Sequence, residues 1–286
     1  MAQLLLGKEV NAAMQTAICE DCRWLQSRGL VPTLAIVRCG ERPDDLSYAR
    51  SAEKRATLCG VAVEQIALPA EVTRGALLDV IDALNTRKDV HGVLLLRPLP
   101  PHLKESEPAI VNRLDPGKDV DGMTDVSAAG VFLGNAAGFA PCTAEACMEI
   151  LRHYHIPCAG RRAVVLGRSP VVGRPLSMLL LAENATVTVC HSHTSDPARI
   201  AREADILISA TGRLHSLTAD FVRPDQTVID VSINWDAHKG GFAGDAVFSE
   251  IEPLVQAITP VPGGVGAVTA TVLIKHVVEA AKRQAG

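Results

Sequence analysis

Short apolar runs rich in β-branched residues alternate along this chain with longer stretches of helical periodicity. The runs are apolar on both faces, which is typical of strands buried in a parallel sheet. We expect strands at residues 33–37, 92–96, 163–167, 186–190, 206–210 and 227–231. We expect helices at residues 8–28, 48–58, 74–85, 143–153, 173–183, 197–203 and 269–283. This alternation predicts an α/β fold with right-handed crossovers and a doubly wound parallel sheet.

Two irregular segments rich in proline and glycine interrupt the alternation, at residues 97–141 and 260–266. Loops of this length in a compact chain are usually functional, and 286 residues suffice for two domains. We therefore expect one α/β domain from residues 1–122 together with 268–286, and a second from 123–267. A ligand-binding cleft is expected between the two lobes.

A strand, a glycine turn and a helix start follow one another in the segment VVLGRSPVVGRP, residues 164–175. Glycines such as Gly167 and Gly173 let the backbone approach a pyrophosphate, which the free N–H groups at a helix start then bind. The Ser169 hydroxyl offers a further donor. Because the spacing is G-x5-G and not G-x-G-x-x-G, an ordinary strand–turn–helix junction is the alternative interpretation.

The end of the next strand distinguishes NAD from NADP. NAD sites usually place an acidic residue there to bind the ribose 2′-hydroxyl. This strand ends in CHSHT, residues 190–194, and no acidic residue occurs before Asp196. Arg168, Arg174 and Ser192 would instead suit a 2′-phosphate. The sequence therefore favours NADP over NAD.

Composition excludes several other classes of protein. The net charge of −4 argues against a nucleic-acid-binding protein. The longest apolar run, residues 176–182, is far shorter than the roughly 20 residues of a membrane helix. The first residues have no basic start typical of a signal peptide, so we expect a cytoplasmic protein without membrane or nucleic-acid partners.

The cysteines and histidines do not form a recognisable metal site. The eight cysteines are scattered, which indicates reduced thiols. Cys19 and Cys22 form a C-x-x-C pair within a helical pattern, but no second pair follows. Two H-x-H pairs, at residues 153–155 and 191–193, lack a nearby carboxylate or thiol to complete a ligand set. We expect no bound metal.

Several distinctive segments are spread over nearly the whole chain. They are GVLLLRPLP at residues 92–100, KDVDG at 118–122, PCT at 141–143, GRS at 167–169, VGRP at 172–175, CHS at 190–192 with Thr194, and TPVPGGVG at 259–266. Together they resemble the methylenetetrahydrofolate dehydrogenase/methenyltetrahydrofolate cyclohydrolase family. The resemblance implies a catalytic lobe closed by the C-terminal helix, a Rossmann-like NADP lobe and a homodimer. It also implies a tetrahydrofolate derivative in the cleft and hydride transfer to NADP.

The resemblance further implies the site residues. Tyr48 and Asp121 match catalytic positions: a carboxylate can accept two N–H bonds from a pterin, and a tyrosine can stack or donate its hydroxyl. From the residues alone, Asp121 as a helix cap or ion-pair partner of Lys118 and Tyr48 as a half-buried core residue stay open. The substrate-binding positions are Tyr48, Leu96, Arg97, Pro98, Asp121, Pro262, Gly263 and Gly264. The cofactor-binding positions are Gly167, Arg168, Ser169, Val172, Gly173, Arg174, Pro175, His191, Ser192, Thr211 and Ile233.

The chain departs from the family pattern where the cyclohydrolase activity resides. The family's lysine, four residues after the tyrosine, falls on Ala52, its glutamine on Leu96 and the following leucine on Arg97. Lys54 is six residues from Tyr48. At ~100° per helical residue, position +4 lies ~40° from the tyrosine and position +6 lies ~240° away. Lys54 should therefore face elsewhere.

These departures affect the two reactions differently. Hydride removal needs chiefly positioning, whereas hydrolysis needs a group that moves protons. We therefore expect oxidation of 5,10-methylenetetrahydrofolate to the methenyl form, with cyclohydrolase activity weak or absent. One alternative is a folate enzyme that uses the methylene carbon for transfer to, or ring closure on, another substrate. It is supported by the unusual Ala267–Val268 and by Arg97, which could bind a carboxylate. Arg97 as a plain surface arginine is the other interpretation. The other alternative function is a fully bifunctional enzyme in which Lys54 restores hydrolysis.

Overall fold

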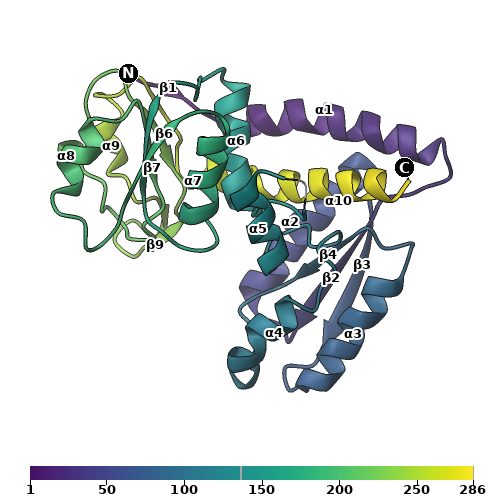
Figure 1. The fold of residues 1–286 in the computed structure, drawn as a ribbon. Helices are drawn as coiled ribbons and strands as arrows, with labels where there is room; N and C mark the ends of the chain where they lie inside the picture. The colour runs from purple at the N-terminus through teal and green to yellow at the C-terminus, as the bar shows by residue number, and fades with distance from the viewer. Residues whose placement is uncertain (136, 286) are drawn as a thin grey trace. The chain divides into compact units, whose positions relative to one another are not determined.

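The computed structural model describes residues 1–135 and 137–285, and they form two compact units. Unit 1 comprises Met1–Ala13 and Thr143–Thr269, and unit 2 comprises Met14–Cys142 and Ala270–Gly286. Both units contain a parallel sheet with helices on it, so the predicted α/β class is confirmed (Figure 1). The predicted limits of the folate-binding and NADP-binding domains, 122/123 and 267/268, differ from the limits of these two units. They stay a prediction about which residues bind which ligand.

Unit 1 is built on a six-stranded parallel sheet. Its spatial order is β1 (Gln3–Leu4), β11 (Ala257–Ile258), β8 (Thr227–Asp230), β7 (Ile206–Ser209), β5 (Arg162–Leu166) and β6 (Thr186–Cys190). Its helices are α6 (Cys142–His153), α7 (Gly173–Ala182), α8 (Pro197–Arg202) and α9 (Phe248–Ile251), with short 3₁₀ turns η2 (Ala219–Phe221) and η3 (Val265–Ala267). From β5 the chain passes to β6 on one side and then to β7 on the other. This reversal of direction creates a switch point at the carboxyl ends of the strands, where ligands of such sheets bind.

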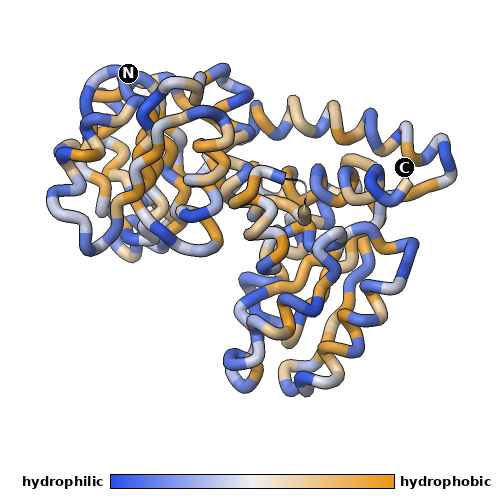
Figure 2. The backbone as a smooth tube through the Cα atoms, viewed as in Figure 1, coloured by the Kyte–Doolittle hydropathy of each residue, from blue (hydrophilic) through white to orange (hydrophobic). Residues whose placement is uncertain are grey.

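Burial explains why the central strands were recognisable and one edge strand is different. All residues of β7 and β8 are buried, and Figure 2 shows the inner strands as hydrophobic. In β6, by contrast, Thr186, Thr188 and Val189 are exposed because this strand forms the edge of the sheet. The expectation of strands buried on both faces is therefore wrong for β6. A small antiparallel hairpin, β9 (Asn234–Asp236) with β10 (Gly241–Ala243), was not predicted.

Unit 2 contains a three-stranded parallel sheet in the order β3 (Ala62–Leu68), β2 (Thr33–Cys39) and β4 (Gly92–Leu95). The longer helices associated with it are α1 (Gly7–Gln26), α2 (Pro43–Cys59), α3 (Arg74–Thr86) and α10 (Thr269–Ala285). Within unit 2, α1 and α10 lie side by side (Figure 1), and Asp21 pairs with Lys282 across them at 2.5 Å. Strand β3 was missed because Glu64 and Gln65 interrupt its apolar character at the sheet edge.

The segment 97–141 is more helical than expected. It contains η1 (Pro101–Ser106), α4 (Glu107–Val111) and α5 (Asp125–Leu133). The Thr124 hydroxyl accepts the backbone N–H of Ser127 and begins α5, and Gly134 ends it in the left-handed conformation at φ 66°. The expectation of a long irregular segment is therefore wrong over these three short helices, because they have too few turns to show a clear period.

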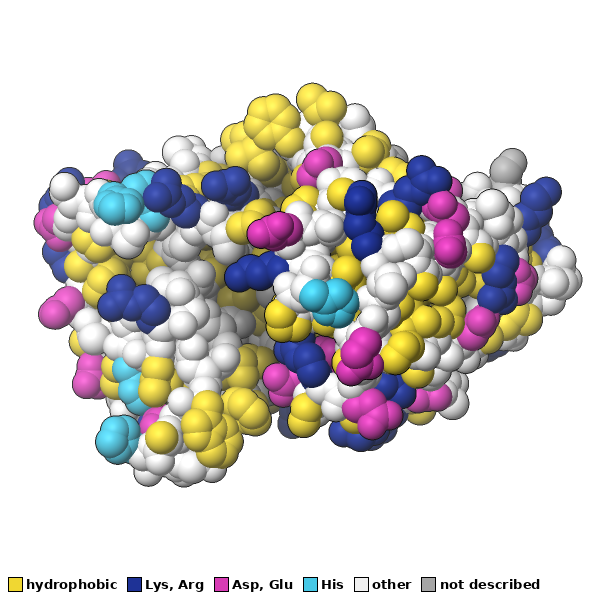
Figure 3. Space-filling view, turned by 90° about the horizontal axis from the view of Figure 1, so that it is seen from below, with side chains coloured by type: hydrophobic (Ala, Val, Ile, Leu, Met, Phe, Trp, Pro, Cys, Tyr) yellow, Lys and Arg dark blue, Asp and Glu magenta, His cyan; other side chains and the backbone are white. Residues whose placement is uncertain are grey.

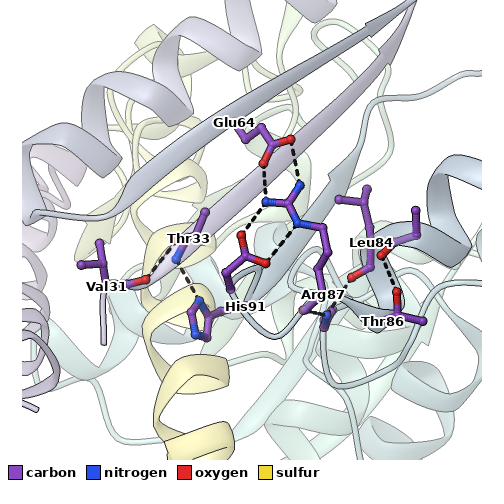
Figure 4. A network of polar contacts seen from close by, with 10 residues as sticks. Val31, Thr33, Glu64, Leu84, Thr86, Arg87 and His91 are labelled. Carbon is purple, nitrogen blue, oxygen red and sulfur yellow. Dashed lines mark hydrogen bonds and ion pairs between the residues drawn. The ribbon is translucent and has the colours of Figure 1, made fainter. Parts of the chain in front are cut away.

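A polar network at one end of the unit 2 sheet joins the end of α3 to β3 and to the segment before β4 (Figure 4). Arg87 binds Glu64 at 2.8 Å and Asp89 at 2.6 Å. The buried Lys118 ammonium donates to the carbonyl of Leu84 at 2.7 Å and to that of Arg87 at 2.5 Å. Lys118 therefore caps the end of α3, and burial lowers the pKa of its ammonium.

The surface carries both charge signs. On the face drawn in Figure 3, Lys and Arg side chains are interspersed with Asp and Glu side chains. Among the described residues, no helix is both long and apolar enough to cross a membrane. All eight cysteines are free thiols.

Candidate functional site

A cavity of about 570 Å³ opens in unit 1 at the carboxyl ends of β5, β6 and β7. Three loops contribute its walls: the one after β5, the one after β6 and the one after β7. The lining residues are Leu166, Gly167, Arg168, Ser169, Cys190, His191, Ser192, Thr194, Pro197, Ala210, Thr211, Arg213, Ser216 and Phe221. The cavity thus lies at the switch point of the sheet, where the topology predicts a ligand.

The glycine turn after β5 has no room for side chains. Gly167 has a φ of 120°, and a Cβ there would lie 2.3 Å from the Ala210 carbonyl oxygen. A Cβ at Gly173 would lie 2.2 Å from the Gly167 carbonyl oxygen. The Ser169 hydroxyl accepts the backbone N–H of Val172 at 3.1 Å and so fixes the turn that precedes α7. The turn therefore brings backbone close to the cavity, as a phosphate site requires.

A buried carboxylate that sequence reasoning missed shapes the loop after β7. Asp245 is fully buried and accepts the backbone N–H groups of Thr211 at 2.8 Å and Arg213 at 2.9 Å. It also accepts the Ser209 hydroxyl at 2.9 Å. These bonds fix the backbone from which Thr211 and Arg213 line the cavity. The only signal in the sequence was an acidic residue after Gly244 in an otherwise irregular stretch.

A second buried carboxylate, Asp230 at the end of β8, holds Asp245 in place. Asp230 accepts the backbone N–H of Asp245 at 3.1 Å and that of Ala246 at 2.8 Å. A Cβ at Gly244 would lie 2.0 Å from an Asp230 carboxylate oxygen, so only glycine fits beside it. Burial, together with the charge of Asp245, raises the pKa of Asp230 to about 6.

The structure brings together part of the predicted cofactor set. Gly167, Arg168, Ser169, His191, Ser192 and Thr211 all line the cavity. Val172, Gly173, Arg174 and Pro175 instead form the start of α7 outside the lining, and Arg174 is exposed. Ile233, 53% exposed, lies beyond β8 and contacts the segment around Gly266. Arg213, Ser216, Phe221 and Thr194 line the cavity but were absent from the predicted set.

The charged side chains that line the cavity are all basic. Arg168, Arg213 and His191 line it, and its lining includes no Asp or Glu. The Thr194 hydroxyl accepts the backbone N–H of His191 at 2.9 Å, which shapes the loop after β6. Such a surface suits an anion of high charge better than a neutral ribose edge. The described residues contain no group of three or more His, Cys, Asp or Glu side chains arranged to hold a metal ion.

In unit 2, Tyr48 on α2 and Asp121 after β4 lie close enough for their charges to interact. Burial, then the nearby Asp119, raises the pKa of the Asp121 carboxyl to about 6, while Arg97 and a hydrogen bond with Cys142 oppose the rise. Burial and the Asp121 charge raise the pKa of Tyr48 well above its ordinary value. A phenol that stays neutral at pH 7 therefore lies near a carboxyl group whose pKa is raised to about 6.

Neighbouring residues take the structural roles that were the alternatives for Asp121. Lys118 is directed at the end of α3, as described above. Asp119 accepts the backbone N–H of Thr124 at 2.7 Å and the Ser127 hydroxyl at 2.6 Å, and so supports the start of α5. Neither pairing involves Asp121. Its carboxyl group lines a small pocket with Arg97 and Asp119.

The buried face of α2 carries alanines where the family resemblance places a lysine. Ala52 is fully buried, as are its neighbours on this face, Ala49 and Ala56. Lys54 is exposed, as the helical angle predicted. Leu96, at the position of the family's glutamine, is 6% exposed. Around Ala52 the buried face of α2 therefore presents methyl groups, with Asp45 nearer the start of the helix and Cys59 at its end.

Arg97 is not an isolated surface residue. Its guanidinium lies 3.5 Å from Glu107, and the other Glu107 oxygen accepts the backbone N–H of Leu99 at 3.2 Å. Arg97 is also near enough to Asp121 to lower the pKa of that carboxyl. One acidic side chain at the start of α4 thus holds both Arg97 and the segment that contains Pro98.

The predicted substrate residues Pro262, Gly263 and Gly264 lie in unit 1. The Gly263 carbonyl accepts the backbone N–H of Gly7 at 2.8 Å, so this turn is attached to the start of α1. A Cβ at Gly264 would lie 2.6 Å from the Pro260 carbonyl oxygen. The contacts of this turn are therefore with other residues of unit 1.

Two protein-family models match the chain in succession. Residues 5–121 match the catalytic domain of tetrahydrofolate dehydrogenase/cyclohydrolase, and residues 141–285 match its NAD(P)-binding domain. The two matches together cover most of the chain.

Full-length relatives give the same result. The chain is 47% identical over 281 residues to the bifunctional protein FolD of Carboxydothermus hydrogenoformans, covering 98% of this chain and 97% of the relative. Its fold is similar to that of the bifunctional methylenetetrahydrofolate dehydrogenase/cyclohydrolase FolD of Campylobacter jejuni, with a TM-score of 0.94, 36% identity and 99% of both chains covered. It is also similar to the FolD structure of Trypanosoma brucei solved with NADP cofactor and an inhibitor, with a TM-score of 0.91, 35% identity, and 99% and 98% of the chains covered.

Proposed function

The chain belongs to the tetrahydrofolate dehydrogenase/cyclohydrolase family, and on that premise we propose that it is an NADP-dependent methylenetetrahydrofolate dehydrogenase with little or no cyclohydrolase activity. The observation that carries the second half of the proposal is the buried, amine-free face of α2 at Ala52. The dehydrogenase half rests on family membership and on the cavity of unit 1.

The residues of unit 1 fit a dinucleotide with a 2′-phosphate. Gly167 and Gly173 leave a backbone cradle that a Cβ would fill, and the cavity of about 570 Å³ follows it. Arg168, Ser192 and His191 can hold the additional phosphate, and the cavity lining lacks the acidic residue typical of NAD sites. The relative solved with NADP supports the same choice of cofactor. When bound, the nicotinamide ring accepts the hydride.

For the folate substrate, the proposal assigns Asp121 to the pterin and Tyr48 to the one-carbon end. An ionised Asp121 accepts two N–H bonds from an aminopyrimidine edge. Tyr48 stays a neutral phenol at working pH, so it can donate a hydrogen bond or pack against the ring. The family resemblance also assigns Leu96, Arg97, Pro98, Pro262, Gly263 and Gly264 to substrate binding, and we propose that role for them.

Cyclohydrolysis of the methenyl product requires activation of water and transfer of a proton. An alanine at position 52 and a leucine at position 96 cannot carry a proton, and both are buried. Lys54 is exposed on another side of α2. Loss of one general acid–base group typically costs a factor of about 10²–10⁴ in rate. We therefore propose that the methenyl product accumulates.

A fully bifunctional enzyme is the second candidate, and one finding favours it. The relative from Carboxydothermus hydrogenoformans, at 47% identity, is a bifunctional protein. A folate enzyme without a redox step is a third candidate. It is favoured by Arg97, which is held by Glu107 and could donate hydrogen bonds to a carboxylate of a second substrate. Hydride transfer separates the third candidate from the other two.

The cofactor assignment is tested by titrating the protein with NADP and with NAD in a calorimeter, then adding methylenetetrahydrofolate to each mixture. We expect tighter binding and faster reduction with NADP. Binding of NADP without any reduced cofactor would contradict the dehydrogenase and favour the non-redox candidate. Equal or tighter binding of NAD would contradict the cofactor choice.

We further propose that the protein is a cytoplasmic homodimer, because family resemblance implies the dimer and the scattered free cysteines indicate a reducing compartment. Light scattering of the purified protein tests the assembly. A mass of two chains is expected, and a mass of one chain at working concentration would contradict the proposal.

A further inference from the structure

Three cysteine side chains meet where the end of α2 contacts α1 within unit 2. Cys19 and Cys22 are one helical turn apart on α1, and Cys59 is the last residue of α2. Cys22 and Cys59 are 1% and 5% exposed, whereas Cys19 is partly exposed. The C-x-x-C pattern alone predicted no role for this pair. The fold adds a third thiol from residue 59, which no sequence spacing reveals.

Hydrogen bonds fix the two helices at this point. The Cys19 thiol donates to the carbonyl of Leu58 at 3.4 Å, and it hydrogen-bonds with the Cys59 side chain. Gln26, two turns further along α1, donates to the Gly60 carbonyl at 3.1 Å. One stripe of α1 is therefore attached to the last residues of α2 at two places, with Cys19 and Cys59 beside each other.

Accessibility gives the three thiols different reactivities. Burial raises the pKa of Cys22 to about 11 and that of Cys59 to about 12, which keeps both protonated at neutral pH. An oxidant from solvent reaches Cys19 first, since it is the partly exposed member. Cys59 is then the neighbouring thiol available to the oxidised sulfur.

We propose that Cys19 and Cys59 are an oxidation site at which a hydroperoxide produces a reversible disulfide between α1 and α2. With hydrogen peroxide, the Cys19 sulfur attacks the O–O bond, becomes a sulfenic acid and releases one water. The Cys59 sulfur attacks the sulfenic sulfur, the S–S bond forms and a second water leaves. Two thiols are oxidised and one peroxide is reduced to two waters, and an external dithiol reverses the change.

Geometry favours Cys59 over Cys22 as the partner. Residues i and i+3 on a helix have Cβ atoms about 5–6 Å apart. A disulfide needs Cβ atoms about 3.5–4.5 Å apart. A bond between Cys19 and Cys22 would therefore distort α1, whereas Cys59 reaches Cys19 from another helix.

Tryptic mapping of the peroxide-treated protein tests the proposal directly. Cys19 and Cys22 share the tryptic peptide 9–23, while Cys59 lies in the peptide 56–74. After treatment with a small excess of hydrogen peroxide and blocking of free thiols, we expect these two peptides to be linked. Incubation with a dithiol should release them. A Cys19–Cys22 disulfide would instead leave peptide 9–23 unlinked and lighter by two hydrogen atoms, and would overturn the proposal.

Single substitutions identify the sulfur atoms. Cys19→Ser and Cys59→Ala should each abolish the linked peptide pair, whereas Cys22→Ala should retain it. Cys158→Ala in unit 1 is the matched control, because it removes a buried thiol outside the trio and should also leave the link intact. Circular dichroism of the reduced variants establishes that each is folded before oxidation. Persistence of the link in folded Cys19→Ser, or its absence from the oxidised original protein, would contradict the assignment.

Discussion

Ala52 lies four residues beyond Tyr48 on α2 and is fully buried, so the helical turn after the tyrosine ends in a methyl group. A lysine at this position would extend from the same face of α2, about 40° around the helix from Tyr48. Lys54, the nearest lysine in sequence, is exposed. Under the proposed function, this relationship separates the two reactions of the family: the groups proposed to position the substrate are present, and position 52 has no group that carries a proton.

Restoring the missing groups should restore hydrolysis. We expect the double substitution Ala52→Lys and Leu96→Gln to raise cyclohydrolase activity by about 10² or more, because it supplies an amine and an amide partner. Conversion of methenyltetrahydrofolate, supplied directly, measures the gain. Lys54→Ala is the matched control and should change nothing. If Lys54→Ala lowers hydrolysis by the unaltered protein, Lys54 is the rescuing group and the proposed loss is wrong.

Asp121 should impose a pH dependence on dehydrogenase activity. Its pKa is raised to about 6, and only the ionised carboxylate accepts both N–H bonds of a pterin edge. We expect kcat/KM to fall as pH drops below about 6 and to be level above it. The pH profile of kcat/KM measures this. Asp121→Asn should remove that inflection and lower kcat/KM by about 10²; an unchanged inflection in this variant would assign the titration to another group.

The same substitution should stabilise the fold at mildly alkaline pH. The pKa of Asp121 in the folded protein lies above its ordinary value of 3.8. The stability that its protonated carboxyl contributes is therefore fully present below pH 3.8 and is lost as the pH rises through about 6. Asp121→Asn removes a charge that the folded state disfavours. We expect the free energy of unfolding to rise by on the order of 1 kcal/mol above pH 7, after allowance for the partial exposure of the side chain. Urea denaturation at low and high pH measures it, and equal or lower stability at high pH would contradict the assignment.

Asp245 should control cofactor affinity although it lies beneath the cavity surface. In Asp245→Asn one of the two side-chain oxygens becomes an NH2 group. Because Thr211 and Arg213 bind different oxygens, this group faces the backbone donor of one of them in either orientation, which would move that loop. We expect NADP affinity to fall by about tenfold or more, with a lower melting temperature. Calorimetric titration with NADP measures the affinity. Glu250→Gln, an exposed carboxylate in the same unit, is the control and should bind NADP normally.

Arg168 should discriminate between the two dinucleotides. It lines the cavity directly after Gly167, whereas Arg174 on α7 does not. Loss of one charge-assisted hydrogen bond is worth about 1.5–3 kcal/mol, so Arg168→Ala should weaken NADP binding by about tenfold or more. NAD binding should hardly change. Arg174→Ala should change the binding of neither NADP nor NAD. Weaker NADP binding in this variant would contradict the assignment and would support the sequence-based prediction that both arginines bind the 2′-phosphate.

The fold was largely predictable because its inner strands are short and apolar. β7 and β8 are buried throughout, and an apolar strand followed by a glycine turn and a helical period marks the region around Gly167. β3 could not be predicted from the sequence, because an edge strand tolerates polar residues such as Glu64 and Gln65. The short helices α4 and α5 escaped because so few turns give no period that can be separated from a loop.

The candidate site was predictable only where a residue's role depends on its own neighbours in sequence. The exposure of Lys54 follows from helical geometry alone. Asp245 could not be found in this way, since it binds the backbone of Thr211 and Arg213 from a distant part of the chain. The meeting of Cys59 with Cys19 depends likewise on how α2 contacts α1.

Whether the methenyl product accumulates is decided by mixing the purified protein with methylenetetrahydrofolate and NADP and following reduced cofactor and methenyl product separately, without acid quenching. We expect both to rise together and the methenyl product to disappear only at its spontaneous rate. Formation of reduced cofactor with rapid disappearance of the methenyl product would show an active cyclohydrolase and contradict the reading of Ala52 and Leu96.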